Sequence, residues 1–488
     1  MRWLVPGLIA LLAFALGVAT GSTGARERLR RVGERAVGSA LVAISPERAS
    51  DVRVRVLMEN PSLISAIQGE GAFGGRSHPS IGLGIFSRNE EAIEAARDLT
   101  QVEKLAPRTW LIRLPVSNAA LFETDKGLVL VDTGAAPAGP GLLDAIRSVS
   151  SAPLHTIIYT HGHVDHAYGT WALLEKGDRP EIVAHAALPR RFERYIRLRG
   201  SIAKYMSQPV DTLPNGVEDL VWPTRTFEDR LELEIGGETF VLQHHLGETD
   251  DQLYVWIAGR KALVCADYCQ EWIPNVENGK RVQRYVEEWA VALREMADLG
   301  AEILLPGHGP AVLETDAIHD DFVVLAEALE SIVEQTIEGL NAGLRKDQVW
   351  ARVRLPDHLA SHPHLQQRYV SVQDVSKMVI KRYTGWWDDI PSHWSPAPVE
   401  AQAIALVDSA GGLDAFVRYA RRLVESDVVL ASHFADWAFL ADPESAQAQQ
   451  LILDVYKQRI LDAGSYTQEK LAYVDQMAAA RRLQLMAE

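Results

Sequence analysis

Four side chains that bind metals fall within six residues of this chain, in the run His161-Gly162-His163-Val164-Asp165-His166. The preceding residues 156–159 (TIIY) are β-branched and aromatic, which predicts a buried strand. The four side chains therefore follow the end of a strand, in the loop that leads to a helix. Imidazole and carboxylate together suit zinc and similar borderline metals. His161 and His163 can hold one ion while Asp165 and His166 turn to a second. The alternative, surface histidines in a polar loop, is disfavoured by so dense a pattern.

Composition is that of a globular protein and disfavours a nucleic-acid partner. At 488 residues the chain is long enough for two or three domains, and 47% hydrophobic residues is an ordinary share. The formal net charge of −16 argues against nucleic acids, because polyanions require a basic surface. The two cysteines, Cys265 and Cys269, are too few for a disulfide framework, and we expect a small core residue and a free thiol.

Residues 1–25 predict an export signal or a membrane anchor. Residues 3–19 are almost wholly apolar, a length between that of a signal-peptide core and that of a short transmembrane span. Small residues at 17–19 (GVA) favour cleavage, whereas the four arginines at positions 26 to 31 favour retention in a bilayer. Both alternatives predict an exported protein, either membrane-anchored through its N-terminus or periplasmic or secreted after cleavage.

Three further parts follow in the sequence. Residues 26–104 form an N-terminal extension, in which the glycine-rich stretch 69–75 predicts loops. Residues 105–318 are expected to form a layered α/β catalytic domain, because strands predicted at 110–114, 119–123 and 128–132 precede a helix at 140–149. Residues 319–488 form the last part, and residues 399–480 are helical by composition.

Further candidate ligands follow three later apolar runs. Glu248 comes shortly after the run at 240–243, Asp267 follows residues 262–266, and His308 follows residues 303–305. An apolar strand followed by an ionisable residue in a turn is how a scaffold delivers ligands to one edge of a sheet. The sequence therefore predicts that these side chains join the histidine run.

Other polar residues are expected to play lesser roles. Asp132 is expected to orient a ligand histidine rather than bind metal itself. His185 also ends an apolar run, and packing is its favoured interpretation, with a substrate contact as the alternative. A role of His244 as a replacement metal ligand is disfavoured. The five arginines within residues 190–199 favour a solvated helix face, with a lipid headgroup or an anionic substrate as the alternative contact.

The succession of motifs resembles the metallo-β-lactamase superfamily. The matching pieces are residues 131–134 (VDTG), the histidine run, residues 247–249 (GET), Asp267 and residues 306–309 (PGHG). The resemblance implies a four-layer αββα sandwich that carries two metal ions at one edge of its sheets. By position it implies one ion held by His161, His163 and Glu248, a second held by Asp165, His166 and His308, and Asp267 as the bridge.

Glu248 narrows the resemblance to the alkylsulfatase branch, because most superfamily members have histidine at that position. Residues 379–389 (VIKRYTGWWDD) look like the segment that precedes the helical dimerisation domain of linear alkyl sulfatases. Residues 435–456 resemble a tetratricopeptide-like hairpin. The resemblance implies an all-α domain over residues 319–488 and a homodimer. Branch members usually add a sterol-carrier-like domain, and we expect none in this sequence, which ends at Glu488.

The predicted function is hydrolysis of an alkyl sulfate or a similar ester of a small amphiphilic molecule. Two divalent ions, zinc first among the candidates, would activate a shared water, with Asp165 and Asp267 as the catalytic carboxylates. The resemblance implies that Asn275 contacts the sulfate and that Lys280 and Arg281 straddle the position of a family arginine, and Tyr205 is a further candidate. The alternatives are a same-fold hydrolase of another ester, phosphoester, lactone or amide, and a non-catalytic membrane-associated scaffold. The complete ligand set disfavours the scaffold.

Overall fold

The computed structural model describes residues 52–60, 62–63, 84–174, 179–206, 208–270, 272–276, 279–462 and 467–487. The chain divides into two compact units, one spanning His78–Asp388 and the other combining Met1–Ser77 with Asp389–Glu488. The signal or anchor predicted at residues 1–25 and the loop predicted at 69–75 lie outside the described residues. In the described part of the chain, no helix is both long enough and apolar enough to cross a membrane.

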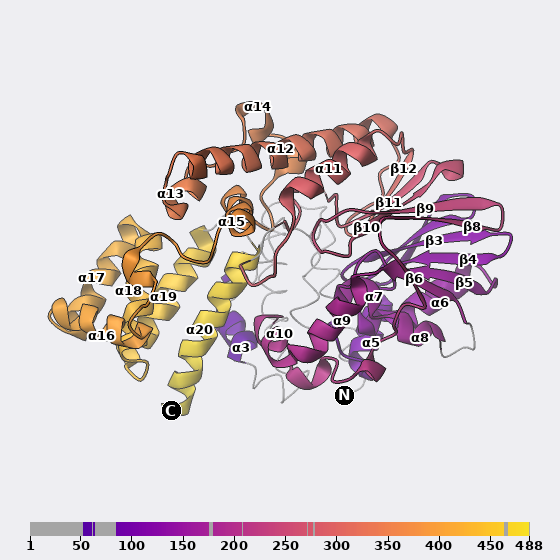
Figure 1. Ribbon diagram of the computed structural model, residues 1–488. Coiled ribbons are helices and arrows are strands. Elements are labelled where there is room, and N and C mark those ends of the chain that lie inside the picture. The colour runs from indigo at the N-terminus through magenta and orange to yellow at the C-terminus, as the bar shows by residue number, and fades with distance from the viewer. Residues whose placement is uncertain are drawn as a thin grey trace, which may run out of the picture. The chain divides into compact units, whose positions relative to one another are not determined.

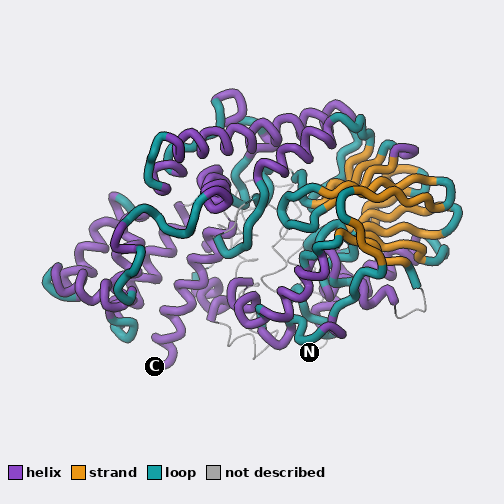
Figure 2. Tube along the Cα trace, in the orientation of Figure 1, coloured by secondary structure: helices purple, strands orange, loops and turns teal. Residues whose placement is uncertain are grey.

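Two β-sheets form the centre of the His78–Asp388 unit (orange in Figure 2). The first sheet contains, in chain order, β1 (Gln101–Ala106), β2 (Thr109–Arg113), β3 (Asn118–Thr124), β4 (Gly127–Val131), β5 (Leu154–Ile158), β6 (Glu181–His185) and β7 (Arg225–Phe227). Its first four strands are antiparallel and the pairs from β4 to β7 are parallel. The second sheet has the order β12 (Ile303–Pro306), β11 (Ala262–Ala266), β10 (Leu253–Ile257), β9 (Glu238–His244) and β8 (Arg230–Ile235), and only β11 and β12 are parallel.

The strand sequences account for their places in the sheets. Every residue of β4 and of β11 is buried, as expected of central strands that are covered on both faces. Most of β8 is exposed or half-buried, and β8 lies at the edge of its sheet. The strands predicted at 110–114, 119–123 and 128–132 are β2, β3 and β4, and the predicted helix at 140–149 is α6 (Gly139–Val149).

Helices cover the outer face of each sheet, which gives four layers (Figure 1). The first sheet packs against helices that include α6, α7 (Val164–Ala167), α8 (Thr170–Leu174), α9 (Leu188–Arg197) and α10 (Arg199–Met206), and α5 (Glu90–Leu99) packs on α6. The second sheet packs against α11 (Val286–Ala297) and α12 (Thr315–Asn341). Between the sheets the rings of Phe122 and Phe240 meet edge to face, with centroids 5.8 Å apart. The predicted αββα sandwich is confirmed.

The first unit extends beyond the boundary predicted at residues 318 and 319. Helix α12, which begins at that boundary, packs along α11 through Phe322, Leu325 and Leu329. Helices α13 (Lys346–Trp350), α14 (Asp357–Ala360) and α15 (Val372–Tyr383) follow, and α15 packs on α11 and α12. Because α12 covers the apolar face of α11, this compact unit continues to Asp388, and the domain boundary at residues 318 and 319 stays a prediction.

The second unit is helical. It contains α3 (Val52–Glu59), α16 (Val399–Ser409), α17 (Leu413–Ser426), α18 (Val428–Ala441), α19 (Ala446–Asp462) and α20 (Thr467–Ala487). Successive helices from α17 to α20 pack on one another across short connections, as in helical hairpins. Helix α3 packs on α20, where Glu59 pairs with Arg481 at 3.0 Å. The helical character predicted for residues 399–480 is confirmed, and the hairpin predicted at 435–456 corresponds to α18 and α19.

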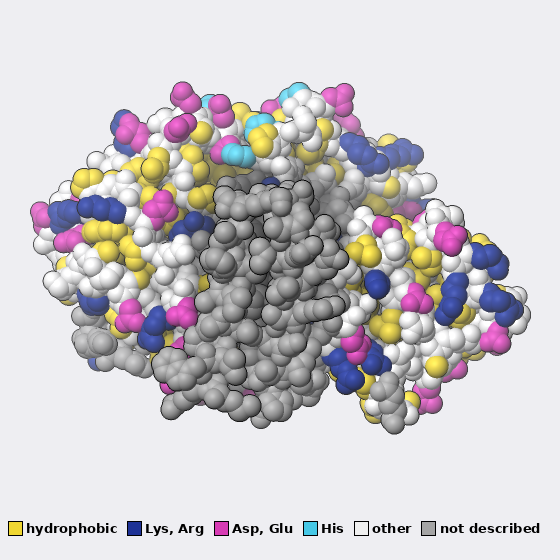
Figure 3. Space-filling view, turned by 180° about the vertical axis from the view of Figure 1, so that it is seen from behind, with side chains coloured by type: hydrophobic (Ala, Val, Ile, Leu, Met, Phe, Trp, Pro, Cys, Tyr) yellow, Lys and Arg dark blue, Asp and Glu magenta, His cyan; other side chains and the backbone are white. Residues whose placement is uncertain are grey.

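The surface mixes charges of both signs. On the face shown in Figure 3, the basic and acidic side chains of the described residues are interspersed rather than gathered by sign. This distribution is typical of a solvated surface, and it accompanies a formal net charge of −16.

Candidate metal centre

The carboxyl ends of several strands deliver the predicted ligands to one edge of the two sheets. His161 follows β5, Asp267 follows β11 and His308 follows β12, while Glu248 lies in the turn between β9 and β10. Two backbone hydrogen bonds join the sheets here, from the backbone nitrogen of Asn118 to the Gly307 carbonyl at 2.8 Å and from the backbone nitrogen of Leu253 to the Thr160 carbonyl at 2.9 Å. The residues that follow β5, β11 and β12 and the turn between β9 and β10 therefore meet at this edge of the sheets.

One group of ligand atoms comes from His161, His163 and Glu248. His161 Nε2 lies 2.9 Å from His163 Nδ1. Glu248 Oε2 lies 3.5 Å from His163 Nδ1 and 3.7 Å from His161 Nε2. Two imidazoles and one carboxylate at these separations form a competent set of ligands for a divalent ion. We call this group the first half-site.

A second group comes from Asp165, His166 and His308. Asp165 Oδ2 lies 3.7 Å from His166 Nε2 and 3.6 Å from His308 Nε2. Asp267 contacts both histidines, with Oδ1 3.3 Å from His166 Nε2 and Oδ2 3.2 Å from His308 Nε2. We call Asp165, His166 and His308 the second half-site.

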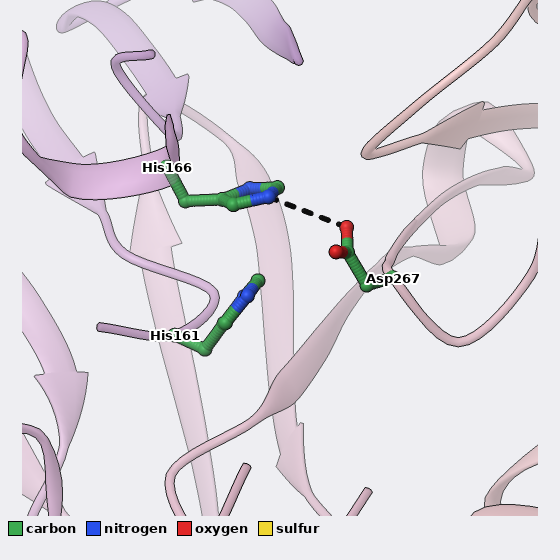
Figure 4. Close-up of side chains that lie close together, drawn as sticks. All are labelled: His161, His166 and Asp267. Carbon is green, nitrogen blue, oxygen red and sulfur yellow. Dashed lines mark ion pairs between the residues drawn. The ribbon is translucent and has the colours of Figure 1, made fainter. Parts of the chain in front are cut away.

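Asp267 also belongs to a third group, with His161 and His166. In Figure 4 the two imidazoles lie one above the other, and the Asp267 carboxylate approaches the end of the His166 ring. The ring centroids of His161 and His166 are 4.2 Å apart. Asp267 thus lies between a ligand of the first half-site and two of the second, the position expected of a bridging carboxylate.

Neighbouring groups orient the ligand histidines. Asp132 Oδ2 accepts a hydrogen bond from His166 Nδ1 at 2.8 Å, which directs Nε2 into the centre. The same carboxylate accepts from the backbone and the hydroxyl of Thr160, and the Thr160 hydroxyl contacts His161 Nδ1 at 3.0 Å. His308 Nδ1 contacts the Val116 carbonyl at 2.8 Å. Asp132 therefore orients ligands, as the sequence predicted.

The donor atoms fit a cation. His166 Nε2, Glu248 Oε2 and Asp267 Oδ1 are buried and have no hydrogen-bond partner within the described residues. A Cβ atom at residue 307 would overlap Asp267 Oδ1, so Gly307 keeps space open beside the bridging carboxylate. Buried polar atoms normally have hydrogen-bond partners. Bound metal ions would explain why these three neighbouring atoms have none.

Burial and neighbouring charges shift the pKa values of the ligand histidines in opposite directions. Burial lowers the pKa of His161 well below its ordinary value. Burial opposes protonation of His166 as well, but Asp267, Asp165 and Asp132 outweigh it and hold the pKa of His166 well above its usual value. Asp267 and Asp165 likewise overcome burial at His308 and raise its pKa to about 9. The second half-site thus attracts positive charge, as a cation-binding site must.

The centre is open on one side. The side chains of His163, Asp165 and His308 are 17%, 19% and 11% exposed, whereas His161 and His166 are fully buried. Access therefore lies over the three exposed side chains, which belong to both half-sites. A substrate approaching from that side meets the two half-sites together.

Three of the predicted substrate contacts, Asn275, Lys280 and Arg281, lie in the segment between β11 and α11. The Asn275 amide nitrogen lies 3.3 Å from Glu248 Oε1. The Arg281 guanidinium lies over the ring of Tyr205, 5.0 Å from its centroid, and Arg281 Nε has no hydrogen-bond partner among the described residues. Lys280 is half-buried in the same segment. The structure thus brings together Arg281 and Tyr205, which are distant in sequence.

Tyr369 connects this arginine electrostatically to the centre. Burial is the largest cause that raises the pKa of Tyr369, to about 12. Arg281 lowers that pKa, while Glu248 and Asp165 raise it. The Arg281 guanidinium and two ligand carboxylates therefore act on the same phenol.

Arg284 is a site residue that the sequence analysis missed. Its side chain is 2% exposed and its Nη1 donates to Glu248 Oε1 and to the Asn275 carbonyl. No strand end or motif marks position 284, so no signal pointed to it.

The predicted solvated helix face is wrong for Arg191. Arg191 is buried and pairs with Asp251 at 2.8 Å and with Asp250 at 2.9 Å. Asp251 Oδ2 in turn accepts a hydrogen bond at 2.7 Å from the nitrogen of Gly162, between two ligand histidines. The pair therefore anchors the metal-binding loop.

His185 and His244 stack on each other, with centroids 3.7 Å apart, and His185 also meets Phe227 edge to face. The predicted packing role fits His185. Neither belongs to a ligand group in the described part of the chain.

Two family patterns match this chain. The Metallo-beta-lactamase superfamily matches residues 112–308, and Alkyl sulfatase dimerisation matches residues 345–482. The first covers all seven predicted ligands, and the second begins within the region that packs on α11 and continues through most of the helical unit.

Curated relatives match across most of the chain. A linear primary-alkylsulfatase from Pseudomonas sp. (strain ATCC 19151) is 25% identical over 358 residues, which are 68% of each protein. Alkyl/aryl-sulfatase BDS1 from Saccharomyces cerevisiae (strain ATCC 204508 / S288c) is 23% identical over 73% of this chain and 60% of its own length. An (R)-specific secondary-alkylsulfatase from Pseudomonas sp. is 23% identical over 73% of this chain and 59% of its own length. The chain thus spans about two thirds or less of these relatives.

A solved structure has the same fold. The stereoselective inverting sec-alkylsulfatase Pisa1 from Pseudomonas sp. superimposes with a TM-score of 0.70 at 19% identity, over 86% of this chain and 70% of that one. Fold, ligand geometry and sequence patterns agree. This chain contains a metallo-beta-lactamase domain, matched over residues 112–308, and an alkyl sulfatase dimerisation domain, matched over residues 345–482, and it is homologous to linear primary-alkylsulfatase.

Proposed function

We propose that the protein hydrolyses sulfate esters of alkyl or similar amphiphilic alcohols in a metal-dependent reaction. The observation that carries the proposal is the complete set of seven ligands. The Arg281–Tyr205 pair is the candidate for binding the sulfate, because Arg281 acts electrostatically on the same Tyr369 phenol as Glu248 and Asp165. The names of the curated relatives, which include primary and secondary alkylsulfatases, support the substrate class.

The ligands fit two divalent ions, and we propose zinc. His161, His163 and Glu248 would hold one, Asp165, His166 and His308 would hold the other, and Asp267 would bridge. When bound, two such ions lower the pKa of a shared water so that it is a nucleophile at neutral pH. Imidazole with carboxylate suits zinc first, with manganese and iron as the next candidates.

The chain's own residues would bind and orient the ester. A sulfate ester is an anion with several acceptor oxygens, and Arg281 offers a guanidinium whose Nε has no hydrogen-bond partner in the described chain. Tyr205 supplies a hydroxyl beside it, Lys280 a second cation and Asn275 an amide. Neighbouring histidines outweigh burial and lower the pKa values of Asp165 and Asp267, so these catalytic carboxylates would stay ionised and orient the attacking water.

The test is a comparison of three esters with one preparation. Zinc-loaded protein lacking residues 1–25 is assayed for sulfate release from a medium-chain alkyl sulfate and for turnover of a phosphodiester and a lactone. We expect sulfate release by the wild type and a loss of at least about 100-fold in His163→Ala. Turnover of another ester without sulfate release would move the substrate to phosphoester or lactone.

We also propose a homodimer and export. The match to the dimerisation family over residues 345–482 supports the dimer, and sedimentation equilibrium of the full chain measures it. The apolar stretch at residues 3–19 supports export, and fractionation of expressing cells with an N-terminal sequence of the mature protein measures it. A monomer in sedimentation, or an unprocessed protein in the cytoplasm, contradicts the respective proposal.

A further inference from the structure

The two carboxylate oxygens of Glu248 have different surroundings. Oε2 faces His161 and His163 and has no hydrogen-bond partner in the described chain. Oε1 accepts from Arg284 Nη1 and from the Asn275 amide at 3.3 Å. The Glu248 backbone nitrogen is also fixed, because it donates to Gln252 Oε1 at 2.6 Å. The carboxylate is therefore held in one orientation, with one oxygen directed at the first half-site.

Arg284 is itself held from several sides. Its Nη1 donates to the Asn275 carbonyl as well as to Glu248, and its backbone nitrogen contacts the sulfur of Met378 in α15 at 3.4 Å. The side chain is 2% exposed and that of Glu248 is 4% exposed. A buried ion pair costs desolvation energy that its attraction often only repays, so stability alone is a weak reason for placing one here.

The charges around the first half-site suggest a role in metal binding for the ion pair between Glu248 and Arg284. Its three ligands are two imidazoles, which bind metals in their neutral form, and one carboxylate. Arg284 offsets the charge of Glu248, which leaves the bridging Asp267 as the other carboxylate near this half-site, whereas Asp165, Asp267 and Asp132 all surround His166 of the second half-site. The first half-site thus keeps the positive charge of a bound cation, which an anionic ester requires.

We propose that Arg284 is a positioning residue for the metal centre, which presents Glu248 to its ion through Oε2 alone and compensates its charge. The inference rests on the metal centre of the proposed function and is independent of the sulfate substrate. Hydrogen-bond partners of metal ligands typically account for about 10- to 100-fold in metal affinity. Asn275 has the same effect on Oε1, in addition to any contact with substrate.

The test measures zinc binding to the full chain, with no ester present. Wild type, Arg284→Gln and Arg260→Gln are equilibrated at a series of buffered zinc concentrations and the zinc per chain is determined. We expect two zinc ions in the wild type and one equilibrium weakened about 10- to 100-fold in Arg284→Gln. Arg260 is the matched control, because it is a buried arginine paired with Glu238 next to the start of β11, whereas Asp267 follows its end. Arg260→Gln should bind zinc like the wild type.

A double variant that removes both charges, Glu248→His with Arg284→Met, keeps the inference testable if Arg284→Gln folds poorly. Glu248→His alone removes the carboxylate partner of the guanidinium, and Arg284→Met alone removes the cationic partner of the carboxylate. The double variant removes both charges, and we expect the first half-site to bind zinc at least about 10-fold more tightly in it than in either single variant. Wild-type zinc affinity in Arg284→Gln, or additive losses in the double variant, overturns the inference. Normal zinc results without any sulfate release would contradict the proposed substrate and leave Arg284 in its role.

Discussion

At the scale of single residues, Asp132 shows how one buried carboxylate orients two ligands. It accepts from His166 and from Thr160, and its backbone has a φ of 64°. Asparagine tolerates this left-handed conformation, so Asp132→Asn tests the hydrogen bonds rather than the backbone. We expect zinc affinity to fall by about 10- to 100-fold, measured by chelator competition. Asp125→Asn is the control, because Asp125 is exposed and pairs with Arg108. Equal zinc affinity in both variants would refute the role of Asp132.

His308 predicts a pH dependence of the metal-free protein. Its pKa is raised from 6.5 to about 9, because Asp267 and Asp165 outweigh burial. The folded state therefore binds this proton more tightly than the unfolded state, and the resulting stability is complete below pH 6.5 and is lost as the pH rises through about 9.

We expect the free energy of unfolding of metal-free protein to fall across that window by at most about 3 kcal/mol through His308. Urea denaturation at several pH values measures the slope. His308→Gln should have a shallower slope than the wild type, and identical slopes would show that another group is responsible.

The seven candidate ligands that the fold brings together could be found in the sequence because each follows an apolar run or lies in a motif. Glu248 and Asp267 are examples, since both lie just beyond strands of the same sheet. Arg284 could not be predicted, because it lies in an irregular segment and reaches Glu248 only through the fold. The interpretation of Arg191 failed for a related reason, because helical spacing says nothing about Asp251 on another segment.

At the scale of elements, the end of β12 fixes the geometry of the bridging carboxylate. The Gly307 nitrogen donates to the Ala266 carbonyl at 2.7 Å, which draws the ends of β12 and β11 together. No side chain fits there, since a Cβ at residue 307 would also lie 3.0 Å from the Ala266 backbone.

Gly307→Ala is therefore expected to displace Asp267 and reduce sulfate release by at least about 100-fold. Gly259→Ala is the matched control, because a Cβ there meets nothing within 4 Å. Assays of sulfate release and zinc content compare the two variants. Normal activity of Gly307→Ala would contradict the close packing at this strand end.

Strands and layers followed from sequence more readily than the domain boundary did. The runs that became β4 and β11 are apolar throughout, and their burial is a local property of the sequence. The extent of the first unit depends instead on the packing of α12 on α11, and the apolar face of α12 does not say which partner it covers.

This packing predicts the outcome of truncation. A protein of residues 78–388 should be soluble and bind zinc, because it retains α12 and α15. A protein of residues 78–318 should aggregate, because the apolar side chains of α11 lose their cover. Size-exclusion chromatography and zinc analysis distinguish them. A soluble, zinc-binding 78–318 protein would restore the boundary predicted from sequence.

At the scale of the whole molecule, the chain joins an α/β unit that carries the candidate metal centre to a helical unit, and family patterns match in both. The fold class and the metal centre could be predicted from sequence, because they depend on strand ends and short motifs. Subunit contacts and the handling of residues 1–25 could not, because surfaces and processing leave weaker patterns. Export and the homodimer stay predictions.

The most direct test of the central claim is zinc titration of metal-free protein during sulfate release from a medium-chain alkyl sulfate. Zinc bound and initial rate are measured on the same samples. The seven-ligand centre predicts no sulfate release without metal, and a rate that rises to its maximum as two zinc ions bind per chain. Sulfate release that is independent of zinc, or that is complete without the residues of one half-site, would contradict a two-metal sulfate ester hydrolase.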